Sequence, residues 1–365
     1  MKKLIILFAM VLAASVAMAQ TNQSAINQAD GSQTATVDQQ GGDNTSTVTQ
    51  SNAANIATVT QINYLLMEDE ANDVTISNVT QSGKRNEATV SQTHSRQGAY
   101  PDDGGPIEAV VNQSGNDNVS EQIQGPHNQI GSSFASVVQS GNNNDAYQIQ
   151  VRWGNDAYIV QSGNGNAARQ AQDTELPDDV VGSENYALIN QSGNSNLADQ
   201  EQHGWDNSVI ATQSGHGNIS TQLQDNSSFM SEATVLQAGS NNMADQYQLG
   251  SLNIGKIEQH SNGNEAYQSQ TADARRDPWV SQEVTWAPLN NAEIYQLGGN
   301  GNVARQTQTT PGGTNDIELN DASIWQNGSN NFAEQAQWGG FNTSTISQTG
   351  SGHVANLTQS QSVVQ

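Results

Sequence analysis

The chain has 365 residues, of which 34% are hydrophobic and 5% aromatic, and its formal net charge at pH 7 is −25. A protein this acidic is repelled by phosphate backbones and anionic lipid surfaces, so nucleic acids and anionic membranes are excluded as partners. The absence of cysteine excludes disulfides and thiolate metal sites, so a fold has to be stabilised by other interactions.

Residues 1–19 have the features of a secretory signal peptide. Two lysines precede an apolar run from Leu4 to Ala14, and an Ala-Met-Ala cleavage site stands before Gln20. The run is too short for a permanent membrane anchor, and no later segment is as long and apolar. We therefore predict a secreted, extracellular bacterial protein without membrane insertion. Loss of the two lysines takes the net charge from −25 to about −27.

Polar residues recur at fixed positions throughout residues 20–365, although the overall composition is typical of disordered chains. Gln recurs at intervals of eleven residues, and two such arms make a repeat of about 22 residues that occurs roughly twelve times. Stacked Gln and Asn side chains can hydrogen-bond to their copies above and below. The predicted structural ladder comprises Gln139, Asn144, Gln150, Asn155, Gln161, Gly163, Asn166, Ala168, Gln172, Asn185, Ala187, Gln191, Asn196, Gln202, Asn207, Gln213, Asn218 and Gln224.

The arms alternate with the period of two that strands require. On the face of the Gln that closes an arm, the residue four positions earlier is small and the residue two positions earlier is larger. The larger residue is mostly Gln in one set of alternate arms and Val or Ile in the other. If each turn folds one strand over the other, a large residue of one strand faces a small residue of the other. Ala168 and Ala187 therefore face the interior, and Arg169 faces outward. Val209 and Ala211 exchange the order but keep the summed volume.

Tight turns join the arms. A Gly stands two residues after most of the Gln residues that open one set of arms, usually within Gln-Ser-Gly-Asn, as at Gly163. Gly and Asn tolerate the left-handed backbone that a tight arc needs. Together these features predict an all-β fold, a β-solenoid of about twelve 22-residue strand-turn-strand repeats in two stacked parallel sheets.

Seven arms are longer than eleven residues, and all seven belong to the same alternate set. The insertions lie near residues 62–74, 93–106, 125–132, 173–184, 225–230, 271–289 and 309–319. Each enters between the opening Gln and the strand, which then resumes in register. We therefore expect all of them at one edge of the solenoid, as exposed loops that carry much of the charge, Asp173 included. The other turns stay tight apart from one extra residue near Gly299.

Candidate sites for chemistry are few. The histidines form no i, i+4 pair, so we predict no zinc site; they are His94, His127, His203, His216, His260 and His353. Acidic runs at 68–70 and 102–103 offer oxygen ligands to calcium but lack the ligand spacing of an EF-hand, which favours solvated loops. The arginines at 275–276, beside Trp279 and Trp286, suggest either a ligand-binding patch or a loop folded on itself. No nucleophile elbow or phosphate-binding loop occurs, so we predict no catalytic residue and no cofactor.

The run of Gln161, Gly163, Asn166, Ala168 and Gln172 resembles the curlin repeat, whose pattern is Ser, five residues, then Gln-x-Gly-x-x-Asn-x-Ala-x-x-x-Gln. The resemblance recurs through nearly all of the chain after the signal, with Asn more often than Ser at the opening position. Curlins are secreted subunits that polymerise into curli, the functional amyloid fibres of bacterial biofilms. The resemblance implies self-assembly into a homopolymer, with a nucleator subunit and an outer-membrane secretion pore as partners.

Three functions are compatible with these features. The first is a secreted structural subunit that assembles end to end into extracellular amyloid fibres for biofilm matrix and surface adhesion. The second is a monomeric surface β-solenoid that acts as an adhesin or binding protein through its flat faces. The third is a polysaccharide-acting β-helix enzyme, which the one-sided insertions fit. The acidic residues of those insertions stand in loops of unrelated length and sequence, so we do not expect an enzyme.

The ends of the repeat array favour the first function. A buried amide without partners costs about 1–3 kcal/mol, and stacking at about 4.8 Å satisfies the amides of inner levels. Neither end has a recognisable cap, because Gln23 to Gln28 leads directly into the first arm and Ser360 to Gln365 continues the strand pattern. Open strand edges template the addition of further strands, so we expect growth at both ends.

Overall fold

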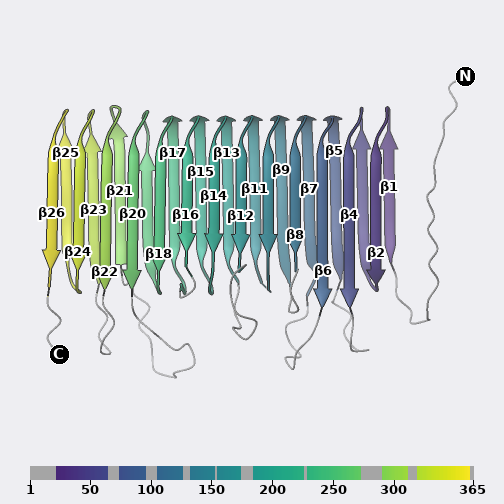
Figure 1. Cartoon of the computed structure of the whole chain (residues 1–365), viewed down its shortest axis with the longest axis horizontal. Coiled ribbons are helices and arrows are strands. Elements are labelled where there is room, and N and C mark those ends of the chain that lie inside the picture. The colour runs from purple at the N-terminus through teal and green to yellow at the C-terminus, as the bar shows by residue number, and fades with distance from the viewer. Residues whose placement is uncertain are drawn as a thin grey trace, which may run out of the picture.

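The computed structural model describes residues 22–64, 74–95, 105–125, 132–152, 154–173, 184–225, 228–272, 290–310 and 319–361. Within these ranges the chain forms 26 strands and no helix. The strands lie in two parallel sheets of 13 strands each, which extend side by side along the whole array (Figure 1). The predicted β-solenoid of two stacked parallel sheets is therefore confirmed, with thirteen levels instead of about twelve.

The odd-numbered strands form one sheet, called here the odd-strand sheet. Its strands are β1 (Gln23–Ala29), β3 (Asn44–Ser51), β5 (Thr75–Lys84), β7 (Ile107–Asn116), β9 (Ser133–Asn142), β11 (Asp156–Asn164), β13 (Tyr186–Asn194), β15 (Ser208–His216), β17 (Glu232–Ser240), β19 (Asn253–Gln259), β21 (Asn290–Gly298), β23 (Asn320–Asn327) and β25 (Thr343–Thr349). Most of these strands continue past the closing Gln into the turn.

The even-numbered strands form the even-strand sheet. Its strands are β2 (Thr34–Gly41), β4 (Ile56–Tyr64), β6 (Glu87–Ser95), β8 (Val119–Gln124), β10 (Asp145–Gln150), β12 (Ala167–Gln172), β14 (Leu197–Gln202), β16 (Ile219–Gln224), β18 (Met243–Leu249), β20 (Glu265–Ala272), β22 (Val303–Thr310), β24 (Phe332–Trp338) and β26 (Val354–Ser360). Every second residue of these strands faces the core, as the alternation of the arms predicts.

Consecutive strands belong to different sheets, because each turn carries the chain across the core. A strand therefore pairs with the strand two places later, which runs parallel to it. The pairing brings equivalent positions of the repeat together: in β11 and β13, Gln161 pairs with Gln191 and Gly163 with Gly193. Because this register is kept along the array, each position of the repeat becomes a row of side chains.

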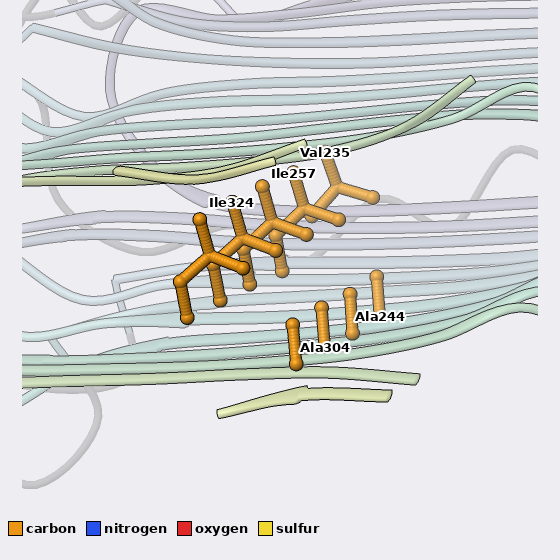
Figure 2. Close-up of a cluster of buried hydrophobic side chains, with 9 residues drawn as sticks. Val235, Ala244, Ile257, Ala304 and Ile324 are labelled. Carbon is orange, nitrogen blue, oxygen red and sulfur yellow. The ribbon is translucent and has the colours of Figure 1, made fainter. Parts of the chain in front are cut away.

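The apolar core consists of a row of large residues from the odd-strand sheet facing a row of alanines from the even-strand sheet. Figure 2 shows Val235, Ile257 and Ile324 in the first row, opposite Ala244 and Ala304 in the second. All five side chains are at most 1% exposed. The same large-against-small packing recurs in two further clusters nearer the N-terminus. The core thus keeps a constant thickness, which lets identical turns close every level.

The arm with the reversed order fits this core without distortion. Val209 and Ala211 lie on β15, are both 0% exposed, and pair with Ala187 and Ile189 of β13 in normal register. The exchanged pair therefore conserves the volume of its level, as predicted.

The two edges of the solenoid differ in their connections. Short turns lead from odd to even strands, whereas all seven insertions lie between an even strand and the next odd strand. The strand ends that flank the insertions are all at the lower edge in Figure 1. The inner parts of the insertions lie outside the described residues: 65–73, 96–104, 126–131, 174–183, 226–227, 273–289 and 311–318. At the opposite edge, the one extra residue shifts the register of β21 between Gln296 and Gly298.

Leucine in place of Ala168 is expected to destabilise the fold. Ala168 belongs to the same core cluster as Ile159 and is 5% exposed, so the three extra carbon atoms of leucine would have to fit into a buried, packed row. Overpacking of this kind costs about 1–3 kcal/mol. The matched control is Ala167→Leu, because Ala167 is the preceding residue of β12 and faces outward. Denaturant unfolding should show a lower midpoint for Ala168→Leu alone; an equal loss in both variants would contradict the inward placement.

Candidate functional site: the side-chain ladders

Two continuous ladders of Gln side chains run through the solenoid, one on each sheet. In both, the Nε2 of one Gln donates to the Oε1 of the Gln on the next strand of the same sheet, at 2.7–3.1 Å. The odd-strand ladder joins Gln28, Gln50, Gln81, Gln113, Gln139, Gln161, Gln191, Gln213, Gln237, Gln259, Gln296, Gln326 and Gln348. The even-strand ladder joins Gln39, Gln61, Gln92, Gln124, Gln150, Gln172, Gln202, Gln224, Gln248, Gln270, Gln308, Gln337 and Gln359.

Apart from Gln28, each ladder Gln also donates to a backbone carbonyl oxygen of the facing sheet and so links the two sheets. Gln161 Nε2, for example, donates both to Gln191 Oε1 at 2.9 Å and to the carbonyl oxygen of Asp145 on the even-strand sheet, also at 2.9 Å. Its side chain is 0% exposed. A buried amide with unused donors would be costly, so these bonds hold neighbouring levels and facing sheets at fixed distances.

A third ladder lies deeper in the core, on the even strands, two positions before the closing Gln. It joins Gln122, Gln148, Gln170, Gln200, Gln222, Gln246, Gln268, Gln306 and Gln335 at 2.8–3.2 Å. At its first member, the buried Oε1 of Gln122 accepts no hydrogen bond, because the preceding strand has Val90 at this position. At its last member, Gln335 Nε2 donates to the hydroxyl of Ser344, and Leu357 follows on β26.

Asparagine ladders border the turns. Asn144 Oδ1 accepts from the backbone N–H of Asn166 at 3.1 Å, and Asn166 Nδ2 donates to the carbonyl oxygens of Ser162 and Gly193, both at 3.0 Å. Each Asn thus ties its own turn to the turns on both sides. At the edge with short turns this ladder includes Asn144, Asn166, Asn196 and Asn218, and at the edge with insertions a second one includes Asn155, Asn185 and Asn207.

Gly163 stands in a column of glycines formed by the Gln-Ser-Gly-Asn turns. Its φ is +101°, and the equivalent Gly141 and Gly193 have φ values of +101° and +99°. A Cβ added at Gly163 would lie 2.0 Å from the carbonyl oxygen of Gly193. Both the left-handed backbone and the close approach of the next turn therefore require glycine.

Asp173 is buried, which corrects the expectation that it is a solvent-exposed loop charge. Its side chain is 1% exposed. Asp173 Oδ2 accepts from the Nδ2 atoms of Asn155 and Asn185, each at 3.1 Å, and Oδ1 accepts from the N–H of Gly204 at 3.3 Å. The carboxylate therefore belongs to the asparagine ladder. A signal for this burial is present in the sequence, because Asp173 directly follows the ladder residue Gln172.

Other side chains singled out in the sequence do not come together in one site. His94 and His203 are buried, and His203 Nε2 lies 3.1 Å from Glu201 Oε1. His260 directly follows β19 of the odd-strand sheet and interacts with Glu258; it lies seven levels away from His94, which is on β6 of the even-strand sheet. Within the described ranges, no group of three His, Asp or Glu side chains is arranged to hold a metal ion. His127, the acidic runs 68–70 and 102–103, and the 275–276 arginines with Trp279 and Trp286 lie outside the described residues.

Aromatic stacking on the outward face of the odd-strand sheet was missed by the sequence analysis. The rings of Phe134, Tyr158 and Tyr186 follow one another at centroid distances of 5.3 and 5.6 Å. Tyr295 and Trp325, which pair in register on β21 and β23, stack at 4.1 Å. Tyr295 and Trp325 stand at the same position of the repeat, one before the closing Gln, but outward residues vary too much for such a pair to stand out in the sequence.

Two acidic side chains from neighbouring turns, Glu184 and Asp206, interact at the edge with the insertions. Burial raises the pKa of Asp206 to about 6, and the hydrogen bond to Glu184 and the negative charge of Glu184 act in the same direction. The two residues directly precede Asn185 and Asn207, which are bonded in the ladder. The register of the ladder therefore forces two acidic side chains together.

No protein-family model matches the chain, and no characterised protein matches it in a search by sequence. Among the described residues there is no helix with the length and apolar character needed to cross a membrane. The β-solenoid fold is consistent with a structural or an adhesive role.

The third ladder provides a test of how much an unbroken row of amides contributes. In Gln170→Val, Gln148 Nε2 loses an acceptor and Gln200 Oε1 loses its donor. We expect the free energy of unfolding to fall by about 1–3 kcal/mol. The matched control is Gln122→Val, which moves the existing end of the ladder by one level and leaves the number of unpaired acceptors unchanged. Equal losses for both variants in denaturant unfolding would show that hydrogen-bond continuity is not the stabilising feature.

The Asp206→Asn variant should be more stable than the unsubstituted chain at pH 7.5. A folded-state pKa of about 6, above the ordinary value of 3.8, means that folding favours the protonated carboxyl. This contribution is complete below pH 3.8 and is lost as the pH rises through 6. The gain in melting temperature from Asn should therefore be present at pH 7.5 and shrink toward pH 4. A gain that is the same at both pH values would contradict the raised pKa of Asp206.

Proposed function

We propose that this chain is a secreted structural subunit that assembles end to end into extracellular, curli-like amyloid fibres, which contribute to biofilm matrix and surface adhesion. Its further partners, by resemblance to curlins, would be a nucleator subunit and an outer-membrane secretion pore. The observation that supports the proposal best is the match between the first and the last level of the solenoid.

The two end levels carry the same kinds of inward residue in the same order. The first level has Ser24, Ile26 and Gln28 on β1 and Ala35, Val37 and Gln39 on β2; the last has Ser344, Ile346 and Gln348 on β25 and Ala355, Leu357 and Gln359 on β26. Placing β25 of one copy beside β1 of the next would continue every row. Among the described residues, β1 pairs with a strand on one side only. Ile26 is accordingly 46% exposed, whereas its partner Val48 on β3 is 0% exposed.

The Gln ladders also have a direction that suits head-to-tail addition. Every Gln-to-Gln hydrogen bond of these two ladders is donated toward the C-terminal end of the solenoid, so Gln28 and Gln39 present Oε1 acceptors at the N-terminal end. At the other end, Gln348 and Gln359 donate to backbone carbonyl oxygens and keep a second amide hydrogen for a following strand. Donors at one end therefore meet acceptors at the other.

The third ladder stops before the ends of the solenoid, which suits a joint that has to form from free subunits. Its position is occupied by Leu357 on the last level and by Val37 on the first. An aliphatic side chain at a free end leaves no amide without partners. When two copies join, these side chains would stack and bury apolar surface.

Net charge opposes assembly. The net charge of −25 makes subunits repel each other at neutral pH, although interactions between exposed charges are screened beyond about 10 Å at 0.1 M salt. Growth is therefore expected to accelerate with added salt, and as the pH falls toward the pI of about 4.2.

A monomeric adhesin is the second candidate. The exposed outward face favours it, since Trp325 on the flat surface of β23 is 40% exposed and stacks on Tyr295. Aromatic side chains on rigid surfaces supply contact area at low entropic cost. The two candidates differ in whether the ends of the solenoid take part.

Seeded growth of the purified full-length chain tests the proposal. Fibre fragments added to fresh protein should abolish the lag in amyloid-dye fluorescence, and electron microscopy should show fibres. Leu357→Lys places a charge in the joint and should slow elongation at least ten-fold. The matched control Thr358→Lys adds the same charge on the exposed outward side of the same strand and should elongate normally.

A chain that stays monomeric and ignores seeds would contradict fibre assembly and favour the adhesin. If both lysine variants elongate at the rate of the unsubstituted chain, assembly does not proceed through this joint. Circular dichroism of both variants before seeding checks that the solenoid is folded.

A further inference from the structure

We infer that the odd-strand sheet has a self-pairing face, through which two copies of this chain associate face to face. This inference goes beyond end-to-end assembly, because it concerns the flat side of the solenoid and not its ends. It rests on the distribution of charge over the two outward surfaces.

Three neighbouring rows on the outward side of strands β1 to β17 contain no charged residue. The rows stand three and one positions before the closing Gln and one position after it. Their members are Ala25, Asn27 and Ala29; Thr47, Thr49 and Ser51; Asn78, Thr80 and Ser82; Val110, Asn112 and Ser114; Ser136, Val138 and Ser140; Tyr158, Val160 and Ser162; Leu188, Asn190 and Ser192; Ile210, Thr212 and Ser214; and Thr234, Leu236 and Ala238. We call these residues the neutral face.

The opposite surface differs. On strands β2 to β18, the rows three and one positions before the closing Gln include Asp38, Glu121, Arg169, Asp199, Glu201 and Asp245. The neutral face ends where β19 brings in Lys256 and Glu258, which pair in register with Thr234 and Leu236. In a chain with 36 acidic residues, a charge-free surface of this length is a feature of one side only.

The centre of the neutral face is apolar. Val138, Val160 and Leu188 lie on adjacent strands, with Ile210 and Leu236 on the next two. Val160 is 38% exposed. A continuous apolar surface surrounded by polar residues is typical of a protein interface. The Ser, Thr and Asn side chains at its margins supply neutral hydrogen-bonding groups.

The strongly negative charge of this protein indicates which partner fits the neutral face. A second copy of this chain is itself strongly acidic, so most of its surfaces are repelled by most surfaces of the first. Neutral face against neutral face brings two copies together with charge-free rows in contact, and leaves the acidic residues of the next outward row, Glu108, Asp156 and Glu232, at the margin. A basic partner would instead favour the acidic surfaces elsewhere on the solenoid. The neutral face therefore fits a second copy of the same chain.

The size of the neutral face is sufficient for a stable interface. Nine strands at about 4.8 Å and three rows at about 6.7 Å cover roughly 43 by 20 Å. This area of about 850 Å² matches the roughly 800 Å² per partner of a standard protein interface. A flat sheet surface also packs well against its own copy, since the two-fold arrangement makes the contacts self-complementary.

Symmetry identifies the residue that tests the pairing. Val138 stands in the middle row of β9, which is the middle strand of the neutral face. A two-fold axis through the centre of the neutral face, in the plane of the interface, places Val138 of one copy opposite Val138 of the other. This holds whether the axis runs along the strands or across them. The chain has no cysteine, so a single introduced cysteine reports on one contact.

Under mild oxidation, freshly purified soluble Val138→Cys should form disulfide-linked dimers at least ten times faster than Ile149→Cys. Ile149 is a matched control, because it is an outward aliphatic residue on the neighbouring strand β10 of the opposite surface. Sedimentation velocity of the unsubstituted chain should show a dimer, and Val160→Lys should shift it to the monomer while Ile149→Lys does not.

Equal cross-linking of Val138→Cys and Ile149→Cys would overturn the inference, as would an unsubstituted chain that sediments as a monomer at its highest soluble concentration. Because soluble protein is measured before fibres form, these outcomes are independent of end-to-end growth. Leu357→Lys, measured in parallel, separates the two: it should lose elongation and keep the Val138→Cys cross-link.

Discussion

The structure depends on one constraint: a buried amide needs partners on both sides, at the spacing of β-strands. Gln161 is fully buried, and its Nε2 and Oε1 are satisfied by Gln191 and Gln139. Such an arrangement works only if equivalent residues stay in register at every level, because a shift by one residue would turn the amides outward. The eleven-residue arms, the glycine turns and the one-sided insertions all preserve that register.

The same constraint makes the ends of a ladder different from its middle. Gln122 has a buried Oε1 without a donor, and beyond it the position belongs to Val90. The outermost levels use aliphatic residues in the deep row and keep Gln only next to the turns, where a free end is accessible to water. An array built in this way tolerates open ends, and in the proposed end-to-end assembly it would give a following copy a continuous set of rows.

The outward side chains are free of this constraint, and they distinguish the two surfaces. Inward positions repeat at nearly every level, whereas outward positions range from the neutral rows of β1 to β17 to the ion pairs between Arg169, Asp199 and Glu201. Surface ion pairs of this kind contribute little to stability. Their distribution instead determines which surfaces of an acidic molecule can approach another copy.

The sequence by itself determined the repeat, the inward positions and the two-sheet solenoid, because a strict period of two within arms of eleven residues leaves one way to bury Ala168 and Gln161. It also predicted which residues stack. Only the tertiary structure decided which stacked groups lack a partner, as at Gln122, and that Asp173 is buried between Asn155 and Asn185. It also decided that outward residues many repeats apart form one neutral face. These features depend on which levels are neighbours in space, and a local sequence pattern does not contain that information.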